Sequence, residues 1–219
     1  MEPTRKALWS TPGLLAVSLT LAACAAPGTG AGTPAAQTLD LAADTRQGEV
    51  PLVVNFTATP DPATAGLLYR WDFGAGAASI GSRSRPYVYT EPGRYTVSAE
   101  VVGAGVGAGV GAGEGARAEV VVEVAESSRP RDPNNQPPTV SLAATSDPAA
   151  PYAVSFAATA EDPNSADTLT YTLDFGDGAR TARSSARHTY DAPGRYLATV
   201  VVTDGRGGAA TAEVEVTLE

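Results

Sequence analysis

The sequence predicts an all-β protein in which two antiparallel β-sandwich domains follow a cleaved signal peptide. Three observations support this fold class: valine and threonine recur in short stretches broken by proline and glycine, these stretches alternate apolar with polar residues, and the whole pattern occurs twice. Beyond the N-terminus, no long stretch keeps the 3.6-residue apolar period of a helix. The 219 residues are enough for two small domains, because a domain commonly has roughly 100–150 residues.

The first 23 residues are expected to form a signal peptide. Arg5 and Lys6 make its start basic, and the apolar run at 14–23 is shorter than the roughly 20 residues that cross a membrane. The run ends in Leu21-Ala22-Ala23-Cys24, which resembles the lipobox of bacterial lipoproteins. That likeness implies cleavage before Cys24 and a membrane anchor, with acyl chains such as palmitate, on its thiol. The alternative is an ordinary signal peptide cleaved after an A-x-A-like site at residues 23–25.

The composition excludes some structures and partners. Cys24 is the only cysteine, so the chain can form no internal disulfide. The net charge of −9 becomes −10 once residues 1–23 are removed, because that segment carries one acidic and two basic side chains. An acidic chain without basic clusters is poorly suited to nucleic acid, since phosphate binding needs concentrated positive charge. No sequence feature indicates oligomerisation.

One sequence unit occurs twice, at an offset of 100 to 102 residues. The matching pairs are Thr38–Ala43 with Thr139–Ala144, Pro51–Thr59 with Pro151–Thr159, Tyr69–Gly76 with Tyr171–Gly178, and Tyr89–Tyr95 with Tyr190–Tyr196. The duplication predicts one domain at 38–126 and a second at 138–219. A flexible tether at 24–37 precedes them, and the polar, proline-rich residues 127–137 form the linker.

Within each copy the strands are predicted by a period of two residues, which is typical of a strand with one buried face. Residues 54–58 and 154–158 each give an inward row of valine, phenylalanine and alanine. Residues 95–101 and 212–218 alternate apolar with polar side chains, and 119–124 do so except at one valine on the polar face. Six or seven such strands per copy, separated by turn residues, predict a sandwich.

Three motifs of the second copy are Asp174-Phe175-Gly176-Asp177-Gly178, His188-Thr189-Tyr190 and Pro193-Gly194-Arg195-Tyr196. Together they resemble the polycystic-kidney-disease (PKD) domain, an immunoglobulin-like sandwich. The first copy carries the matching residues Trp71, Asp72, Phe73, Tyr89, Pro92, Gly93 and Tyr95. It departs from the family at Ala75 and Tyr87, and the second copy departs at Leu173, where tryptophan is usual. The resemblance covers nearly all of both copies.

The motif residues also have structural roles that follow from their positions. Tyr95 and Tyr196 come after a Pro-Gly turn, where a sandwich places a tyrosine whose ring packs inward and whose hydroxyl donates to backbone. The aromatic residues of the WDF and LDF strands share one face and should fill the core. The glycines after them provide the backbone freedom of a tight turn. Asp72 and Asp174, between the aromatic positions, are expected on the outward side of their strands.

The second copy also carries acidic residues that suit calcium, which prefers several oxygen ligands including two or more carboxylates. The candidate ligands are Asp162, Asn164, Asp167, Asp174, Asp177 and Asp204. Some PKD-like domains bind calcium near such loops, so the resemblance makes calcium a candidate for this copy, but the sequence alone assigns the chain no metal and no cofactor. The spacing is not that of an EF-hand, and the first copy has only Asp61 and Asp72 at corresponding places. The alternative is that Asp177 is a turn residue and that residues 161–167 form a solvated loop.

We expect no enzyme activity. The chain has one histidine, His188, which we expect to be a packed strand residue, and it has no G-x-S-x-G motif. The sequence predicts an exported lipoprotein on the extracytoplasmic side of a membrane, whose domains bind an envelope protein or a polysaccharide or act as a spacer. The alternatives are an accessory subunit that tethers a secreted hydrolase or polymer, and a calcium-stiffened adhesion module. The glycine-rich insertion 103–116 is expected to be a flexible loop or, alternatively, a silk-like hairpin extension.

Overall fold

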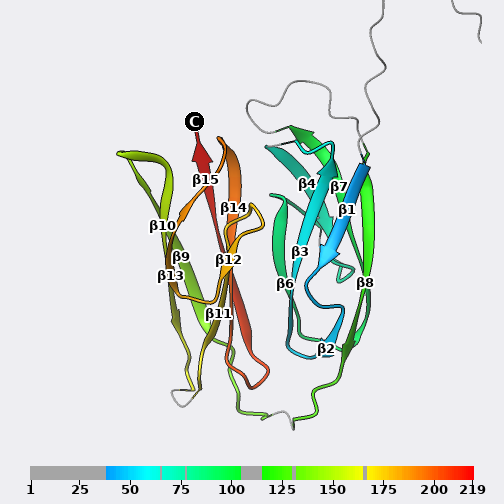
Figure 1. The fold of residues 1–219 in the computed structure, drawn as a ribbon. Coiled ribbons are helices and arrows are strands. Elements are labelled where there is room, and N and C mark those ends of the chain that lie inside the picture. The colour runs from blue at the N-terminus through cyan, green and yellow to red at the C-terminus, as the bar shows by residue number, and fades with distance from the viewer. Residues whose placement is uncertain (1–37, 65, 77, 105–114, 130–131, 165–166) are drawn as a thin grey trace, which may run out of the picture. The chain divides into compact units, whose positions relative to one another are not determined.

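The computed structural model describes residues 38–219 except 65, 77, 105–114, 130–131 and 165–166 (Figure 1). These residues form two β-sandwiches, which confirms the predicted fold class. The predicted signal peptide, the tether with Cys24 and most of the glycine-rich insertion lie outside the described residues. In the part of the chain that the structure describes, no helix is long and apolar enough to span a membrane.

The first sandwich has eight strands in its described residues. They are β1 (Thr38–Ala43), β2 (Gln47–Glu49), β3 (Leu52–Asp61), β4 (Leu67–Asp72), β5 (Ala78–Gly81), β6 (Ser84–Tyr89), β7 (Gly93–Ala104) and β8 (Arg117–Ala125). One sheet has the order β1-β3-β6 and the other the order β2-β8-β7-β4-β5. The count exceeds the six or seven predicted, because β2 and β5 are too short to show an alternating pattern in the sequence. The pairing of β2 with β8 is parallel, whereas the other pairs are antiparallel.

Among its described residues the second sandwich has seven strands, all paired antiparallel. They are β9 (Thr139–Asp147), β10 (Ala150–Glu161), β11 (Thr170–Asp174), β12 (Arg180–Thr181), β13 (Ser185–Thr189), β14 (Gly194–Thr203) and β15 (Ala209–Leu218). One sheet has the order β13-β10-β9 and the other the order β12-β11-β14-β15. The last two strands are joined by the short turn at 204–208, where the first copy carries its insertion.

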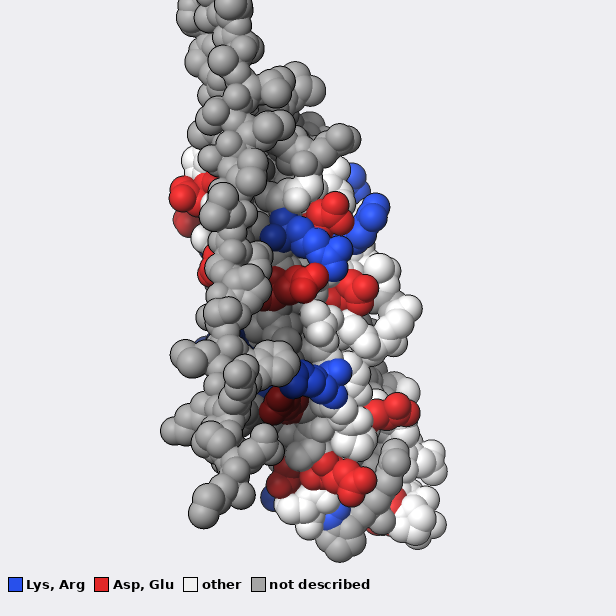
Figure 2. Space-filling view, turned by 90° about the vertical axis from the view of Figure 1, so that its right-hand side faces the viewer, with Lys and Arg blue, Asp and Glu red and all other residues white. Residues whose placement is uncertain are grey.

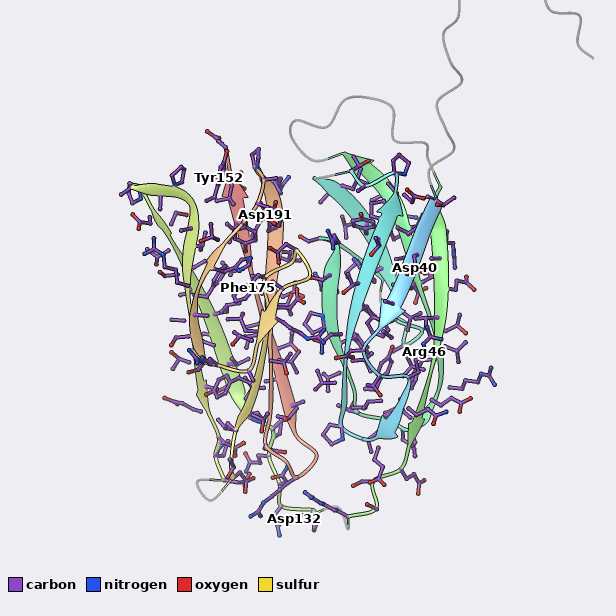
Figure 3. All side chains as sticks on the ribbon, in the orientation of Figure 1. Asp40, Arg46, Asp132, Tyr152, Phe175 and Asp191 are labelled. Carbon is purple, nitrogen blue, oxygen red and sulfur yellow. The ribbon has the colours of Figure 1, made fainter. Side chains whose placement is uncertain are left out.

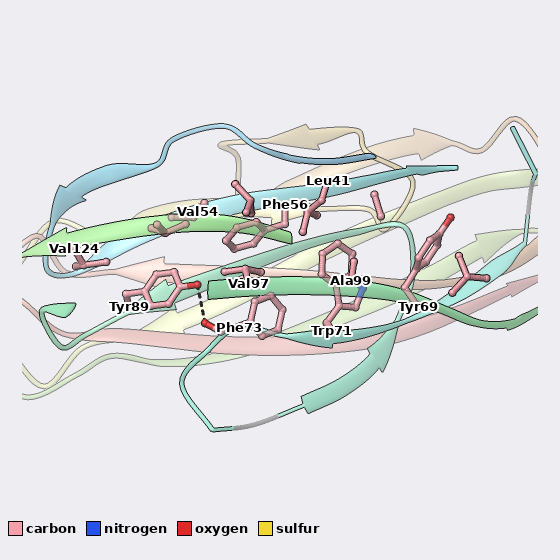
Figure 4. Close-up of a cluster of buried hydrophobic side chains, with 14 of the residues drawn as sticks. Leu41, Val54, Phe56, Tyr69, Trp71, Phe73, Tyr89, Val97, Ala99 and Val124 are labelled. Atoms are coloured by element: carbon pink, nitrogen blue, oxygen red, sulfur yellow. Dashed lines mark hydrogen bonds between the residues drawn. The ribbon is translucent and has the colours of Figure 1, made fainter. Parts of the chain in front are cut away.

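The core of the first sandwich is aromatic. Trp71 is fully buried and its indole N–H donates to the Ser82 carbonyl at 3.0 Å. Phe73 stacks on Trp71, with 6.0 Å between the ring centroids, and on Tyr87 at 4.3 Å. Figure 4 shows Trp71 and Phe73 with Val97 of their own sheet and with Val54 and Phe56 of the opposite sheet. The Tyr89 hydroxyl donates to the Phe73 carbonyl. Because no disulfide is possible, this packing is a main source of stability.

The second core repeats this plan with fewer large rings. Leu173, fully buried, occupies the position of the tryptophan, and Phe175 packs on Phe156 at 5.2 Å between centroids. Phe175 lies among the side chains between the two sheets in Figure 3. The Tyr190 hydroxyl donates to the Phe175 carbonyl at 2.9 Å. The strand face predicted to be apolar is therefore buried in both copies.

The turn after each aromatic strand requires glycine. Gly74 and Gly176 have φ values of 75° and 89°, which L side chains rarely adopt. A Cβ at Gly176 would lie 2.8 Å from the Leu197 carbonyl oxygen, and one at Gly74 would lie 2.9 Å from the Thr96 carbonyl oxygen. The same strand-to-turn geometry thus occurs in both copies, because the same residues specify it.

The corner tyrosines also have the predicted bonds. The Tyr95 hydroxyl donates to the Glu91 carbonyl, and the Tyr196 hydroxyl donates to the Ala192 carbonyl, each at 2.9 Å. Each hydroxyl bond spans the Pro-Gly turn and ties the incoming loop to the start of the next strand. The Pro-Gly-x-Tyr motif is therefore explained by local structure.

Candidate functional site

The motif aspartates of the two copies make the same local bond. Asp72 Oδ1 accepts the Gly74 N–H and Asp174 Oδ1 accepts the Gly176 N–H, both at 2.8 Å. A carboxylate that accepts the backbone N–H two residues later closes an Asx turn, which fixes the chain reversal after the strand. This role is structural and needs no metal.

The two aspartates differ in their surroundings. Asp72 is exposed, whereas Asp174 is 1% exposed and also accepts a hydrogen bond from the Ser84 hydroxyl at 2.5 Å. Asp174 was predicted on the outward side of its strand, and in the structure this side chain is covered by residues of β6. Burial raises the pKa of Asp174 to about 6, while the bonds from Ser84 and the Gly176 N–H act in the opposite direction.

Residues at the start of β6 and just before it make further bonds to the second copy. The Ser84 hydroxyl accepts the Gly178 N–H at 3.0 Å, and the Ser82 hydroxyl accepts the Leu197 N–H at 2.6 Å. Arg85 is 6% exposed and pairs with Glu213 at 2.5 Å. Sequence reasoning missed these residues, because two serines and an arginine at and just before a strand give no periodic signal.

Asp177 is paired with the only histidine of the chain. His188 Nε2 lies 2.6 Å from Asp177 Oδ2, and the His188 ring stacks on Phe175 with 4.2 Å between centroids and 3° between planes. In the first copy Tyr87 takes the place of the histidine and stacks on Phe73, and the aspartate is absent. The histidine and the aspartate thus occur together in the second copy and are both absent from the first. Asp177 pairs with the imidazole nitrogen, which a tyrosine ring lacks.

Three of the other acidic candidates come together at one end of the second sandwich. Single carboxylate oxygens of Asp162, Asp167 and Asp204 all lie within 4.8 Å of one another, and we call these three residues the acidic cluster. Asp162 follows β10, Asp167 lies in the loop before β11, and Asp204 follows β14. Loops from three places in the sequence therefore converge, whereas Asp174 and Asp177 are committed to the contacts described above.

Backbone bonds hold the acidic cluster in place. Asp204, which is 2% exposed, accepts the N–H groups of Arg206 at 2.7 Å and Gly208 at 2.9 Å through Oδ1. Asp162 Oδ1 accepts the Asn164 N–H at 2.7 Å, and the Asp167 N–H donates to the Asn164 carbonyl at 2.9 Å. Asn164 thus shapes the loop, and its own side-chain oxygen accepts a backbone N–H of the linker.

The linker adds a residue that sequence reasoning missed. Asn135 Nδ2 donates to Asp204 Oδ2 at 2.7 Å, and Asn135 Oδ1 is buried without a hydrogen-bond partner. Asp132, labelled in Figure 3, lies in the same linker segment and bonds the Asn134 N–H. Asparagine in a proline-rich linker is common, so only its distance to the cluster identifies Asn135.

Buried oxygens without hydrogen-bond partners distinguish this cluster from ordinary surface acids. The Asp167 side chain has no exposed surface, and neither of its carboxylate oxygens has a hydrogen bond, although Arg206 Nε lies 2.6 Å from Oδ1. Asp162 Oδ2 is likewise buried and without a partner. Such atoms are costly unless a cation or a donor meets them. The donor set, carboxylate and amide oxygens with no nitrogen or sulfur, fits Ca²⁺.

The first copy has no equivalent of the acidic cluster among its described residues. Asp61 aligns with Asp162, and it is exposed at the end of β3. The other two cluster positions align with Ala65 and Gly103 in the first copy. One copy of the tandem therefore serves as an internal comparison for the other.

The surface shows no concentration of positive charge on the face seen in Figure 2, where acidic and basic side chains are interspersed. The described residues also form exposed ion pairs, for example Arg195 with Glu215 and Arg117 with Glu119. The described part of this face therefore offers no concentrated positive charge that would bind phosphate.

Comparison with known proteins agrees with the duplication. Residues 38–106 match a family model described as the PKD domain, and residues 135–218 match another PKD domain model. No curated protein matches the sequence at a significant level.

Among solved structures, the chain is similar to the PKD1 domain of Vibrio anguillarum Epp, with 25% identity and a TM-score of 0.35 over 39% of this chain and 98% of that one. It is also similar to the PKD1 domain of the Vibrio cholerae metalloprotease PrtV, with 21% identity and a TM-score of 0.34 over 38% of this chain and 99% of that one.

Proposed function

Because this chain carries two PKD domains in tandem, we propose that it is a non-catalytic exported lipoprotein that presents a binding surface in the bacterial envelope. The membrane anchor is the acylated thiol of Cys24, and the ligand is an envelope protein or a polysaccharide. One cysteine of this class carries several acyl chains, which suffices for stable attachment. The family assignment and the lipobox-like sequence before Cys24 support this proposal.

The observation that carries the non-catalytic proposal is that His188 is engaged in structural contacts. Its Nε2 is paired with Asp177 and its ring lies between Phe175 and Tyr190, so the only imidazole of the chain serves the core. General-base activation of a hydroxyl nucleophile commonly requires such a side chain within hydrogen-bond reach. No serine or threonine hydroxyl is hydrogen-bonded to His188 in the described residues.

The anchor is tested by Cys24→Ala. The expected result is protein that is released or remains unprocessed, instead of mature protein that sediments with membranes. Globomycin-type inhibition of the lipoprotein signal peptidase should also block processing in the natural chain. If Cys24→Ala leaves both the mature size and the membrane fractionation unchanged, the anchor proposal is wrong.

The binding role is tested by a pull-down from envelope extract with the purified protein. Enrichment of a glycan or of a structural envelope protein would support the binding proposal. Recovery of one stoichiometric hydrolase would instead support the alternative, an accessory subunit that holds an enzyme at the membrane. The absence of any specific capture would favour a spacer.

We also propose that the second sandwich binds calcium at the acidic cluster. The buried oxygens of Asp162, Asp167 and Asn135 that lack hydrogen-bond partners carry this proposal. Asp162, Asp167, Asp204 and Asn135 would hold the ion, whose charge would neutralise the buried carboxylates and join three loops. A bound ion stabilises the folded state by about 2.7 kcal/mol when its concentration is a hundred times Kd.

Calcium binding is tested by the melting temperature with and without millimolar Ca²⁺. The natural chain should melt several degrees higher with the ion, and Asp162→Asn should abolish the shift. Asp61→Asn is the matched control, because Asp61 aligns with Asp162 in the copy that lacks the cluster. A shift that survives Asp162→Asn would place the ion elsewhere.

A further inference from the structure

Arg206 lies against the acidic cluster. Its Nε is 2.6 Å from Asp167 Oδ1 and its Nη1 is 3.9 Å from Asp132 Oδ2 in the linker. The two partners differ sharply in exposure: the Asp167 side chain is completely buried, whereas 48% of the Arg206 side chain is exposed. Arg206 therefore covers the buried carboxylate from the solvent side.

The contact between Arg206 and Asp167 is close but poorly aligned. The Nε atom lies within ion-pair distance of Oδ1, yet its geometry is not that of a hydrogen bond, so both oxygens of Asp167 keep unfilled acceptor positions. A bidentate arginine–carboxylate pair would have filled them with two parallel bonds. The guanidinium thus supplies charge near Asp167 without satisfying it.

The charges of this site are also unequal. The acidic cluster holds three carboxylates, and Arg206 is the one cation paired with any of them in the described residues. A calcium ion brings two positive charges and takes carboxylate oxygens directly as ligands. Where Arg206 now neutralises one carboxylate in part, a calcium ion would satisfy several.

We infer that Arg206 is an internal cation that holds the acidic cluster in the absence of calcium and competes with the ion for Asp167. This inference rests on the calcium proposal and concerns what sets the affinity of the same site. Arg206 follows Asp204 in the turn at 204–208, and its side chain can turn toward solvent because half of it is already exposed. Asp132 remains within reach of the guanidinium as a partner after displacement.

The test is isothermal titration of the purified protein with CaCl₂, comparing the natural chain with Arg206→Gln. Glutamine keeps much of the side-chain length and the backbone N–H bond to Asp204 but removes the positive charge. The matched control is Arg195→Gln, which removes an exposed arginine of the same sandwich that pairs with Glu215. Circular dichroism and the melting temperature without calcium establish that each variant is folded.

The expected result is a Kd for calcium that is roughly tenfold lower in Arg206→Gln, with a lower melting temperature in calcium-free buffer, while Arg195→Gln changes neither. If Arg206→Gln binds calcium and the natural chain does not, the competition by Arg206 is also supported. The calcium proposal would then hold for the variant and not for the natural chain. If the natural chain binds calcium and Arg206→Gln binds equally or more weakly, the competition is overturned and the calcium proposal stands. If neither the natural chain nor Arg206→Gln binds calcium at about 10 mM, both the competition and the calcium proposal are overturned.

Discussion

Replacing Asp174 with asparagine should stabilise the second sandwich at neutral and alkaline pH. The carboxylate is 1% exposed, and its burial raises its pKa from 3.8 to about 6. Asparagine has nearly the same shape and retains a carbonyl oxygen that can accept from the Ser84 hydroxyl and the Gly176 N–H. It removes the cost of holding a negative charge away from water.

The size of the effect follows from the pKa difference. A rise of roughly two units corresponds to about 3 kcal/mol between the protonated and ionised forms. Because the pKa of Asp174 is higher in the folded than in the unfolded protein, its contribution to stability is fully present below pH 4 and is lost as the pH rises through about 6. Above that pH the folded state carries the full cost of the buried charge.

The measurement is urea unfolding at pH 3.5 and at pH 8, followed by circular dichroism. The free energy of unfolding of Asp174→Asn minus that of the natural chain should be larger at pH 8 by about 3 kcal/mol. Taking the difference at each pH removes the titration of all other groups, which the two chains share.

The first copy provides the matched control. Asp72 makes the same bond to the glycine two residues later, but it is exposed. Asp72→Asn should therefore change the free energy of unfolding little, and by the same amount at both pH values. If the effect of Asp174→Asn is also independent of pH, burial of Asp174 does not control its ionisation and the explanation is refuted.

Other substitutions test the remaining contacts by their free energies of unfolding. His188→Ala should lower the free energy of unfolding by about 2–3 kcal/mol, because the ring packing is lost. The double variant His188→Tyr with Asp177→Ala, which copies the first domain, should recover most of that loss. Equal losses in the two variants would contradict the pairing of His188 with Asp177. Gly176→Ala should cost about 3 kcal/mol because it adds a steric clash to a positive φ, whereas Gly205→Ala, with φ of 73° and open space around it, should cost only about 1 kcal/mol; similar costs would show that the clash is unimportant. Tyr196→Phe should cost about 1 kcal/mol by removing one hydroxyl bond, and no change would assign the tyrosine's role to its ring alone.

Much of the fold could be predicted because its signals are local. A two-residue period predicts which side of a strand is buried. A Pro-Gly turn before Tyr196 predicts that its hydroxyl bonds the backbone of that turn. The duplication doubled these signals, so a position that differs between copies stood out. The first copy has Ala75 where the second has Asp177, so this aspartate varies between the copies, but its pairing with His188 could not be predicted.

The candidate site could be predicted only in part. Asp162, Asp167 and Asp204 were among six candidate ligands, and nothing in their spacing separated them from Asp174 and Asp177. Their grouping depends on where the loops after β10 and β14 lie, which is a matter of strand order in two different sheets. Asn135 was absent from the candidates because it belongs to the linker.

Residue type and local period were thus enough to establish two sandwiches, their buried faces and the turns that require glycine. These properties depend on backbone sterics and on burial of one strand face, which neighbouring residues specify. The burial of Asp174 beneath Ser84 and the meeting of three aspartates with Arg206 depend on contacts between segments far apart in the chain. Such contacts leave no period in the sequence. Only the folded chain therefore shows which carboxylates accept a hydrogen bond from a distant segment and which lie beside a cation.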